Sequence, residues 1–331
     1  MFSLLINELG GIAEKFDRLE AVTGNLIGQC VAKLNEIQDR EDEIWKSTLF
    51  TLSVLCFSRI LRFDEVAAAL ELFLRLLDNC AIDCLGHVCD GINYITERHY
   101  QHCEAHYFMK DDAKILTKLM RLVQRKVYHE CVIRIFGNLS AHTDSTYIDA
   151  LISLGLLEEM VKIFESEDNR MKELACWVLS NFTAGTSQQV EAVIFHKELT
   201  EHLIALAYSC PPFVAKQLVW TLSNATCHGS STTIAKLVEY GCIECACKLL
   251  PVPQVNQHTC LEGLTNILRE GENLVNEETL FNPYALRFAN CGGLELLEDV
   301  KEDNDLLTFF GEKYELFLAR KRGLLTKSAR F

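Results

Sequence analysis

The feature that most constrains this chain is a helical segment that occurs twice, 43 residues apart. The two copies read LACWVLSNFTAG at 174–185 and LVWTLSNATCHG at 218–229. Each contains a tryptophan followed four residues later by an asparagine, as Trp177/Asn181 and Trp220/Asn224. Because residues four apart share one face of a helix, the two copies predict equivalent Trp/Asn stripes on two equivalent helices.

The same frame continues in both directions along the chain. Steps of 40 to 44 residues connect successive pairs, which are Phe50/Val54, Asp90/Tyr94, Arg134/Asn138, the two tryptophan pairs and Glu262/Asn266. We call these twelve residues the ladder positions. The chain has only five prolines and shows no sustained strand alternation. A helical period of about 40–47 residues predicts an all-α armadillo-repeat solenoid wound as a right-handed superhelix.

Leucine-rich stretches at helical spacing recur at 154–164, 240–250 and 291–300. Gly155, Gly241 and Gly292 or Gly293 stand near their starts, where a tight turn between helices needs an unhindered backbone. The fifteen cysteines predict buried thiols rather than a disulfide framework. Those expected to be buried include Cys176, Cys227, Cys245 and Cys247.

Charge and hydropathy narrow the class of partner. The formal net charge is −14, from 46 acidic and 32 basic residues. This excess of acids argues against nucleic acid and favours a basic ligand, although acidity that only maintains solubility is an equal alternative. There is no run of eighteen apolar residues, so no membrane partner is expected.

The Trp/Asn pattern is suited to binding an extended, basic peptide. An asparagine carboxamide carries both a donor and an acceptor, so it can pair with a peptide unit whatever its side chain. Tryptophan faces form slots for the aliphatic stem of Lys or Arg and attract its charge. The alternative is that the tryptophans belong to the core and the asparagines cap local backbone.

These motifs resemble the armadillo domain of importin alpha, the nuclear-import adaptor. The resemblance covers residues 46–320 and is carried by LACWVLSNFTAGT, IRIFGNLSAHTD, CLEGLTNILREGE and FNPYALRFANCGGLELLEDV. The family has an arginine in place of the sixth-repeat tryptophan, so Arg134/Asn138 is similar to repeat six. The two tryptophan pairs then correspond to repeats seven and eight, and CDGINYITE to repeat five.

In importin alpha, two Trp/Asn ladders bind nuclear localisation peptides, and the resemblance implies that the minor one is retained here. The implied peptide-binding residues comprise backbone-clamping asparagines, slot-forming tryptophans and their neighbours: Asn138, Asn181, Asn224, Trp177, Trp220, Arg134, Ser180, Asp144 and Tyr94. Asp144 matches an acidic position that receives a basic side chain.

The chain also departs from the family pattern. Leu174 and Gln217 occupy positions where importin alpha has acids, so weaker recognition of Lys and Arg is expected. Phe50/Val54 has no carboxamide, and Asp90 replaces the fifth-repeat tryptophan. The resemblance therefore implies that the major peptide site is lost.

We expect three regions: an N-terminal helical cap or remnant repeat at 1–45, armadillo repeats resembling importin alpha repeats four to ten at 46–322, and a basic tail at 323–331. Residues 1–45 contain four scattered basic residues rather than an Arg/Lys-rich arm. Binding of importin beta through such a segment is not expected. The tail could bind an acidic groove or remain solvated.

Two functions stay open at this point. The first is an adaptor for protein import that binds a basic linear motif and occurs in nucleus and cytoplasm. The second is an armadillo scaffold dedicated to one protein partner, with a new interface at the N-terminal repeats. A metal- or thiol-dependent enzyme is a remote third, because His102 and His106 are spaced to suit zinc. Neither a cofactor nor enzymatic activity is expected.

Overall fold

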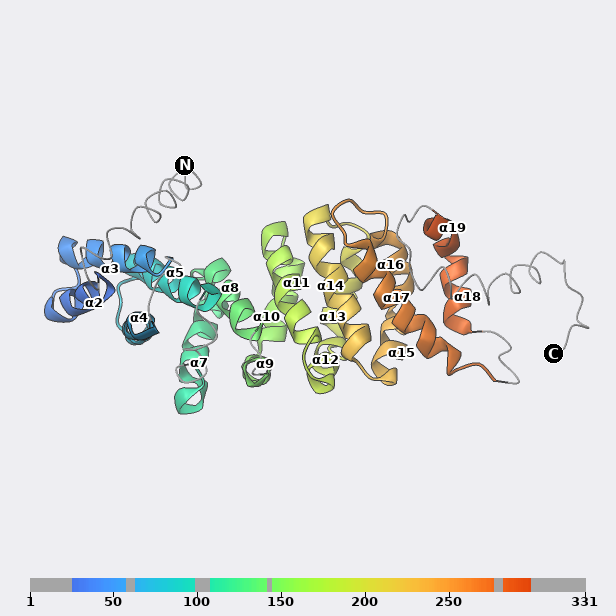
Figure 1. The fold of residues 1–331 in the computed structure, drawn as a ribbon, viewed down its shortest axis with the longest axis horizontal. Coiled ribbons are helices and arrows are strands. Elements are labelled where there is room, and N and C mark those ends of the chain that lie inside the picture. The colour runs from blue at the N-terminus through green and yellow to red at the C-terminus, as the bar shows by residue number, and fades with distance from the viewer. Residues whose placement is uncertain (1–25, 58–62, 99–107, 142–144, 277–281, 299–331) are drawn as a thin grey trace, which may run out of the picture. The chain divides into compact units, whose positions relative to one another are not determined.

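In the computed structural model, residues 26–57, 63–98, 108–141, 145–276 and 282–298 are described (Figure 1). Within these ranges every regular element is an α-helix and no strand occurs. The chain divides into two compact units, residues 1–159 (unit 1) and 160–331 (unit 2). The all-α armadillo architecture predicted from the sequence is confirmed. No helix in the described ranges has the length and apolar character that crossing a bilayer requires.

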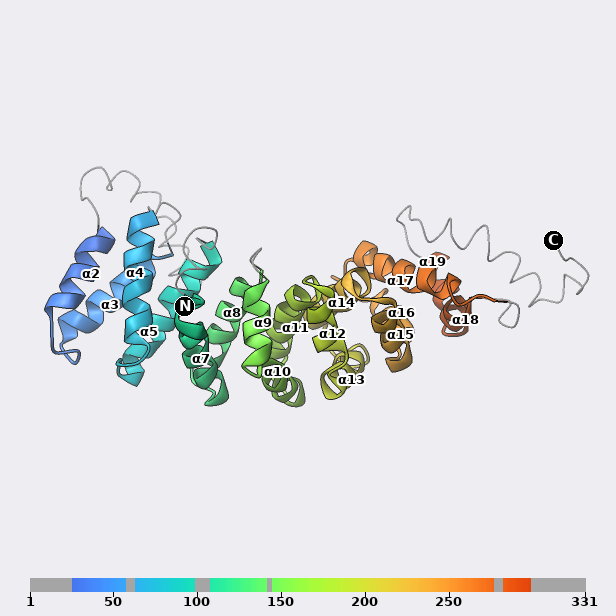
Figure 2. The ribbon, with the colours of Figure 1, turned by 90° about the horizontal axis from the view of Figure 1, so that it is seen from below.

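Unit 1 is built from helices that pair along the chain. Its elements are α2 (Leu26–Glu36), α3 (Glu43–Leu55), α4 (Phe63–Leu76), α5 (Ile82–Arg98), α7 (Lys110–Gln124), α8 (His129–Ser140) and α9 (Thr146–Ser153). Helix α2 packs on α3, α4 on α5, and α7 on α8. The ladder positions lie on α3, α5 and α8, which also pack on one another in chain order (Figure 2).

The core of unit 1 is apolar and aromatic. Phe73, Phe108 and Phe136 are fully buried, and Trp45 is 2% exposed. The Trp45 indole Nε1 donates to the carbonyl oxygen of Leu34 at 3.2 Å, which satisfies its one polar atom and fixes α3 against α2. Helix α3 begins at the cap residue Asp42, whose carboxylate accepts from the Ile44 amide at 2.7 Å.

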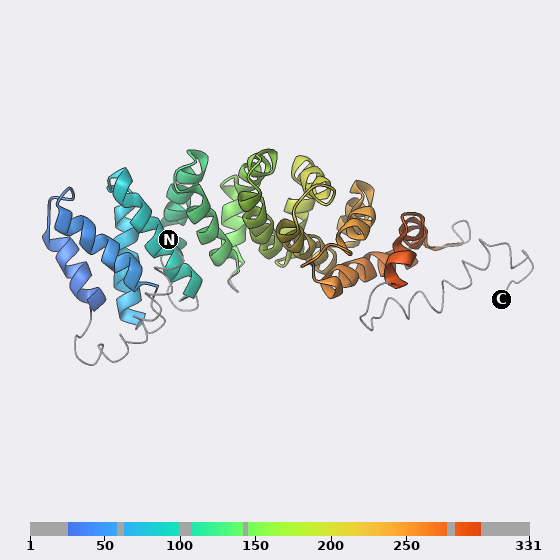
Figure 3. The same cartoon turned by 90° about the horizontal axis from the view of Figure 1, so that it is seen from above.

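Unit 2 repeats a three-helix group. Helix α10 (Leu156–Glu165) spans the boundary, and the following elements are α11 (Asn169–Thr183), α12 (Ser187–Ile194), α13 (Lys197–Leu206), α14 (Pro212–His228), α15 (Ser231–Tyr240), α16 (Cys242–Leu249), α17 (Gln257–Glu272), α18 (Pro283–Asn290) and α19 (Gly293–Glu298). Helices α12, α13 and α14 pack together, and α15, α16 and α17 do the same. Figure 3 shows these groups following one another from green to orange.

Local sequence signals set the helix boundaries of unit 2. Thr186 and Gln189 form a reciprocal capping box at the start of α12, and Asp168 caps α11. Gly155, Gly241 and Gly292 have φ of +88°, +100° and +81°. These left-handed values favour glycine because it lacks a Cβ, so the predicted helix-to-helix turns are confirmed.

The cysteine prediction holds for three of the four named residues. Cys176, Cys245 and Cys247 are buried, whereas Cys227 is exposed. The expectation for Cys227 was wrong because it lies seven residues after Trp220 and three after Asn224. Positions with that spacing share a helix face, and here the face is the one that carries the ladder positions.

Candidate functional site

The ladder positions of unit 2 lie on α11, α14 and α17, which pack in that order. Two hydrogen bonds fix the register of α14 on α11. The Thr221 hydroxyl donates to the Cys176 carbonyl oxygen at 2.8 Å, and the Asn224 amide Nδ2 donates to the Ser180 carbonyl oxygen at 3.0 Å. Trp220 and Asn224 therefore stand beside the turns of α11 that carry Trp177 and Asn181.

Both tryptophans of this pair of helices contact solvent. Trp220 is 38% exposed, and Trp177, Asn181 and Asn224 are half-buried. Neither indole is enclosed in the core, unlike that of Trp45 in unit 1. Ser180 differs from its neighbours, because it is only 7% exposed and its hydroxyl donates to the Trp177 carbonyl oxygen at 2.8 Å. Its backbone oxygen, rather than its hydroxyl, meets the next repeat.

Helix α17 adds a third rung that the expected site residues did not include. The Asn266 amide Nδ2 lies 3.0 Å from Cys227 Sγ and 3.4 Å from Thr226 Oγ1, both on α14. Glu262 occupies the tryptophan position of this rung and is exposed. The step of 42 residues from Asn224 to Asn266 was the signal that could have placed it in the site.

Three ladder asparagines share a contact that sequence reasoning did not anticipate. Asn138, Asn224 and Asn266, the bridging asparagines, each donate Nδ2 to the ladder helix one repeat earlier in the chain. A carboxamide has two N–H donors and an acceptor oxygen, so these contacts use only part of each carboxamide's hydrogen-bonding capacity. They also hold the side chains in one orientation, which lowers the entropy lost on binding a ligand.

The bridge at Asn224 gives a prediction about stability. Changing Thr221 to Val and Asn224 to Ala removes both of these hydrogen bonds from α14 to α11, so unit 2 should lose about 1–3 kcal/mol in total. Urea unfolding measures the loss. Thr232→Val, at an exposed position of α15, should cost much less, and equal losses for the two variants would contradict the register assigned here.

The positions flanking the tryptophans carry little available negative charge. Leu174 is 5% exposed, so it belongs to the core. Gln217 is neutral and half-buried. Glu173 is paired with Arg170 at 2.9 Å, and its side chain is 24% exposed. Of the carboxylates near these helices, Glu262 is the exposed one at a ladder position.

In unit 1, the polar ladder positions contact side chains of their own or the neighbouring ladder helix. Arg134 pairs with Glu130 at 2.9 Å across one helical turn of α8. Asn138 Nδ2 donates to Thr96 Oγ1 at 3.1 Å. Asp90, at a tryptophan position, accepts a weak bond from Cys131 Sγ at 3.7 Å, and burial raises the pKa of the Asp90 carboxyl.

Two further ladder positions of unit 1, Phe50 and Tyr94, form aromatic contacts. Phe50 is 49% exposed, and its ring meets that of His87 edge-on at a centroid distance of 5.2 Å. Tyr94 meets Phe57 in the same way at 5.1 Å, and the Arg98 guanidinium lies 3.9 Å from the Phe57 centroid. At the asparagine positions of unit 1, Val54 and Tyr94 thus lack a carboxamide, whereas Asn138 keeps one.

Several expectations fall outside the described residues. They are Asp144, the histidine cluster containing His102 and His106, the first 25 residues and the tail at 323–331. In the described part, Glu165, Glu198 and His202 bring ligand atoms within 4.8 Å of one another. Both carboxylates are exposed, and such a surface group is not by itself a metal centre.

Comparison with known proteins supports the relationship that the motifs indicate. The family model for the Armadillo/beta-catenin-like repeat matches residues 144–184. Importin subunit alpha-8 of Arabidopsis thaliana is 27% identical over 245 residues, which is 72% of this chain and 54% of that protein. Importin subunit alpha-4 of the same plant is 28% identical over 281 residues, which is 83% of this chain and 51% of that protein. The chain is a divergent importin-alpha-like protein.

The importin-alpha-like chain spans about half the length of the curated relatives it matches. Among solved structures it is similar to the designed armadillo repeat protein YIII(Dq)4CqI, with a TM-score of 0.60 and 22% identity over 72% of this chain and 98% of that one. A second designed armadillo protein, YIII(Dq.V1)4CPAF in complex with the peptide (KR)4, has a TM-score of 0.58 and 20% identity over 73% of this chain and 98% of that one. These likenesses support the fold. The curated relatives are importin alpha subunits, which agrees with the expectation that this chain is not an enzyme.

Proposed function

We propose that the importin-alpha-like chain binds an extended peptide along the ladder positions of unit 2. The observation that carries the proposal is the pair of solvent-contacting tryptophans on the packed helices α11 and α14, each followed by an asparagine one turn later. The indoles offer flat apolar faces, and the carboxamides offer backbone-like hydrogen bonds. A strand-like peptide needs both, because its own backbone groups are unpaired.

The ligand class that fits best is a basic linear motif of the nuclear localisation type. An indole attracts a guanidinium or ammonium group that lies over its face, and the chain carries a net charge of −14. The relatives are importin alpha subunits, and one structural neighbour was solved with the peptide (KR)4. Import of cargo into the nucleus, with residence in nucleus and cytoplasm, is the role we propose.

A second function, a scaffold dedicated to one protein partner, is favoured by a specific observation in unit 1. There the ring of Phe50 meets that of His87, and the ring of Phe57 meets that of Tyr94. Phe50 is 49% exposed, and exposed aromatic rings are typical of protein–protein interfaces. In this alternative, partner binding would depend on Phe50 and would survive loss of Trp177 and Trp220.

The test of the first function is a titration of fluorescein-labelled (KR)4 peptide, followed by anisotropy at low and moderate salt. Trp177→Ala combined with Trp220→Ala should weaken binding about tenfold or more, because two cation–π contacts are lost. Tyr208→Ala is the matched control, since Tyr208 is an exposed aromatic of unit 2 that lies outside α11, α14 and α17. Unchanged binding by the double variant, with circular dichroism like wild type, would refute the proposal.

Restoring an acid provides a gain-of-binding prediction. Gln217→Glu should strengthen binding of (KR)4 about twofold to fivefold at low salt, because a partly exposed ion pair of this kind is worth up to about 1 kcal/mol, and salt should erase the gain. Leu174 is buried, so a carboxylate there would destabilise the helix pair instead. Gln188→Glu, at an exposed position of α12, controls for net charge, and an equal gain from both variants would count against recognition at the ladder.

A further inference from the structure

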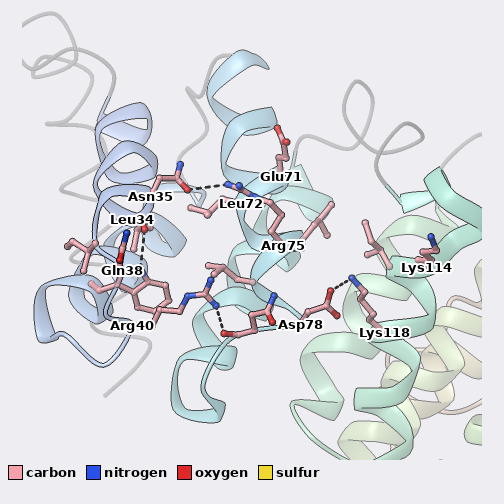
Figure 4. Close-up of a pocket in the computed structure, with 16 residues that line it drawn as sticks. Leu34, Asn35, Gln38, Arg40, Glu71, Leu72, Arg75, Asp78, Lys114 and Lys118 are labelled. Carbon is pink, nitrogen blue, oxygen red and sulfur yellow. Dashed lines mark hydrogen bonds and ion pairs between the residues drawn. The ribbon is translucent and has the colours of Figure 1, made fainter.

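A basic pocket opens on unit 1, mainly along α2, α4 and α7, which carry no ladder positions, with Trp45 of α3 in its lining (Figure 4). Its volume is about 720 Å³. The floor is apolar and includes Leu34, Trp45 and Leu72, all nearly buried. Four cationic side chains and two anionic ones line it, Arg40, Arg75, Lys114 and Lys118 against Glu71 and Asp78. This excess of positive charge contrasts with the net charge of −14 for the chain.

The contacts inside the pocket leave most of this positive charge without a counter-ion. Arg75 Nη2 donates to the neutral Asn35 Oδ1 at 3.2 Å, and Arg40 Nη1 donates to the carbonyl oxygen of Asn79. Lys118 forms an ion pair with Asp78. Figure 4 shows Arg75 reaching toward α2 and Lys118 reaching toward Asp78.

Lys114 has no hydrogen bond or ion pair with any residue that the structure describes. Glu71 stands one helical turn before Arg75, yet no ion pair joins them. A guanidinium has five N–H donors, so each arginine keeps donors for a ligand. Cations gathered in one hollow repel one another, and an anion that enters relieves this repulsion.

The size and lining of the pocket indicate which anion fits. A volume of about 720 Å³ lies within the range of sites for drug-sized ligands, so a single carboxylate or phosphate would leave most of it empty. The cations come from three successive segments of unit 1, which suits several negative groups along one chain. Between them lie Ile37 and Ile115, both half-buried, whose side chains would accept apolar groups.

We propose that this pocket binds an acidic, leucine-containing linear segment of a protein partner, with its carboxylates paired to Arg40, Arg75 and Lys114. Arginine and lysine pair with carboxylates through charge-assisted hydrogen bonds, and the half-buried isoleucines contact the leucines. The ligand has the opposite charge to the one proposed for unit 2. The chain would therefore hold a basic motif and an acidic motif on separate sets of helices.

The probe is a fluorescein-labelled peptide of four Asp-Glu-Leu repeats, titrated into the full chain and followed by anisotropy. Arg75→Gln combined with Lys114→Gln should weaken binding about fivefold or more, because each neutralised contact is worth about twofold to fivefold. Arg121→Gln is the matched control, because Arg121 is exposed on α7 but does not line the pocket. It should change affinity less than twofold. Trp177→Ala combined with Trp220→Ala should leave this binding intact.

Two further peptides and one competitor distinguish the sources of affinity. A peptide of Asn-Gln-Leu repeats should not bind, and one of Asp-Glu-Ser repeats should bind more weakly than the probe. Equal binding of the charged and uncharged peptides would overturn the proposal, as would equal binding by wild type and the Arg75/Lys114 variant. Complete displacement by inorganic phosphate at the peptide's own concentration would replace it with a site for a single anion. Absence of binding to folded wild type would also overturn it.

Discussion

Above about pH 9, unit 2 should lose stability steeply, because its core contains thiols that remain protonated only while it is folded. Cys242, Cys245 and Cys260 are buried on α16 and α17. Burial raises the pKa of Cys242 and of Cys260 to about 12, and it raises that of Cys245 as well. The ordinary thiol value for these groups is 9.0.

The sign of the effect follows from proton linkage. Below about pH 9 both states hold these protons, so the thiols contribute their full stability. Above that value the unfolded chain releases protons that the folded one keeps, and stability falls until the folded pKa is reached. Each thiol then removes about 1.4 kcal/mol per pH unit, and the three together remove about 4 kcal/mol per pH unit.

Urea unfolding in the presence of a reductant, repeated at several pH values from neutral to alkaline, measures this slope. Cys260→Ala should cost some stability near neutral pH through the cavity it leaves, but it should lower the alkaline slope by about 1.4 kcal/mol per pH unit. Cys227→Ser removes an exposed thiol and should alter the slope much less. An unchanged slope in Cys260→Ala would show that other groups cause the alkaline loss.

Adding one methyl group at Gly91 should destabilise unit 1 by about 1–3 kcal/mol. Gly91 is buried in α5, and a Cβ there would lie 2.3 Å from Cζ and 2.4 Å from Cε2 of Phe73. Phe73 is fully buried on α4, so its ring has no open space into which it can turn. Helices α4 and α5 would have to separate, which would disturb the pairing on which both depend.

A double variant tests this account of Gly91. Phe73→Leu alone should cost stability through lost packing, yet together with Gly91→Ala it should cost less than the sum of the two single changes. Thermal unfolding of the four proteins gives the coupling. Strict additivity would mean that the ring of Phe73 is not what limits the size of residue 91.

The sequence predicted the features of this fold that depend on local pattern. The period from Asn138 through Asn224 to Asn266 places each asparagine at an equivalent point of a ladder helix. The turns at Gly155 and Gly241 were equally predictable from the sequence. Few residues other than glycine adopt the left-handed backbone conformation that ends a helix there. Right-handed winding of the superhelix stays a prediction, as do the three regions at 1–45, 46–322 and 323–331.

Features that depend on contacts between repeats were not predictable. Nothing local indicates that Asn224 Nδ2 meets the Ser180 carbonyl, since the two are 44 residues apart in the chain. The exposure of Cys227 required knowing which face of α14 stays open. The basic pocket is likewise assembled from α2, α4 and α7, with Arg75 and Lys114 each unremarkable on its own helix.

The bridging asparagines also determine how neighbouring repeats share free energy. In a one-dimensional array, stability is the sum of each repeat's own term and a term for each junction. Asn224 and Asn266 contribute to junction terms inside unit 2, on helices that also carry the proposed peptide site. A ligand that competed for Nδ2 would uncouple adjacent repeats, whereas one that used the remaining amide hydrogen and the oxygen would leave the junction intact. Peptide binding and the cooperativity of unfolding would then depend on the same asparagine side chains.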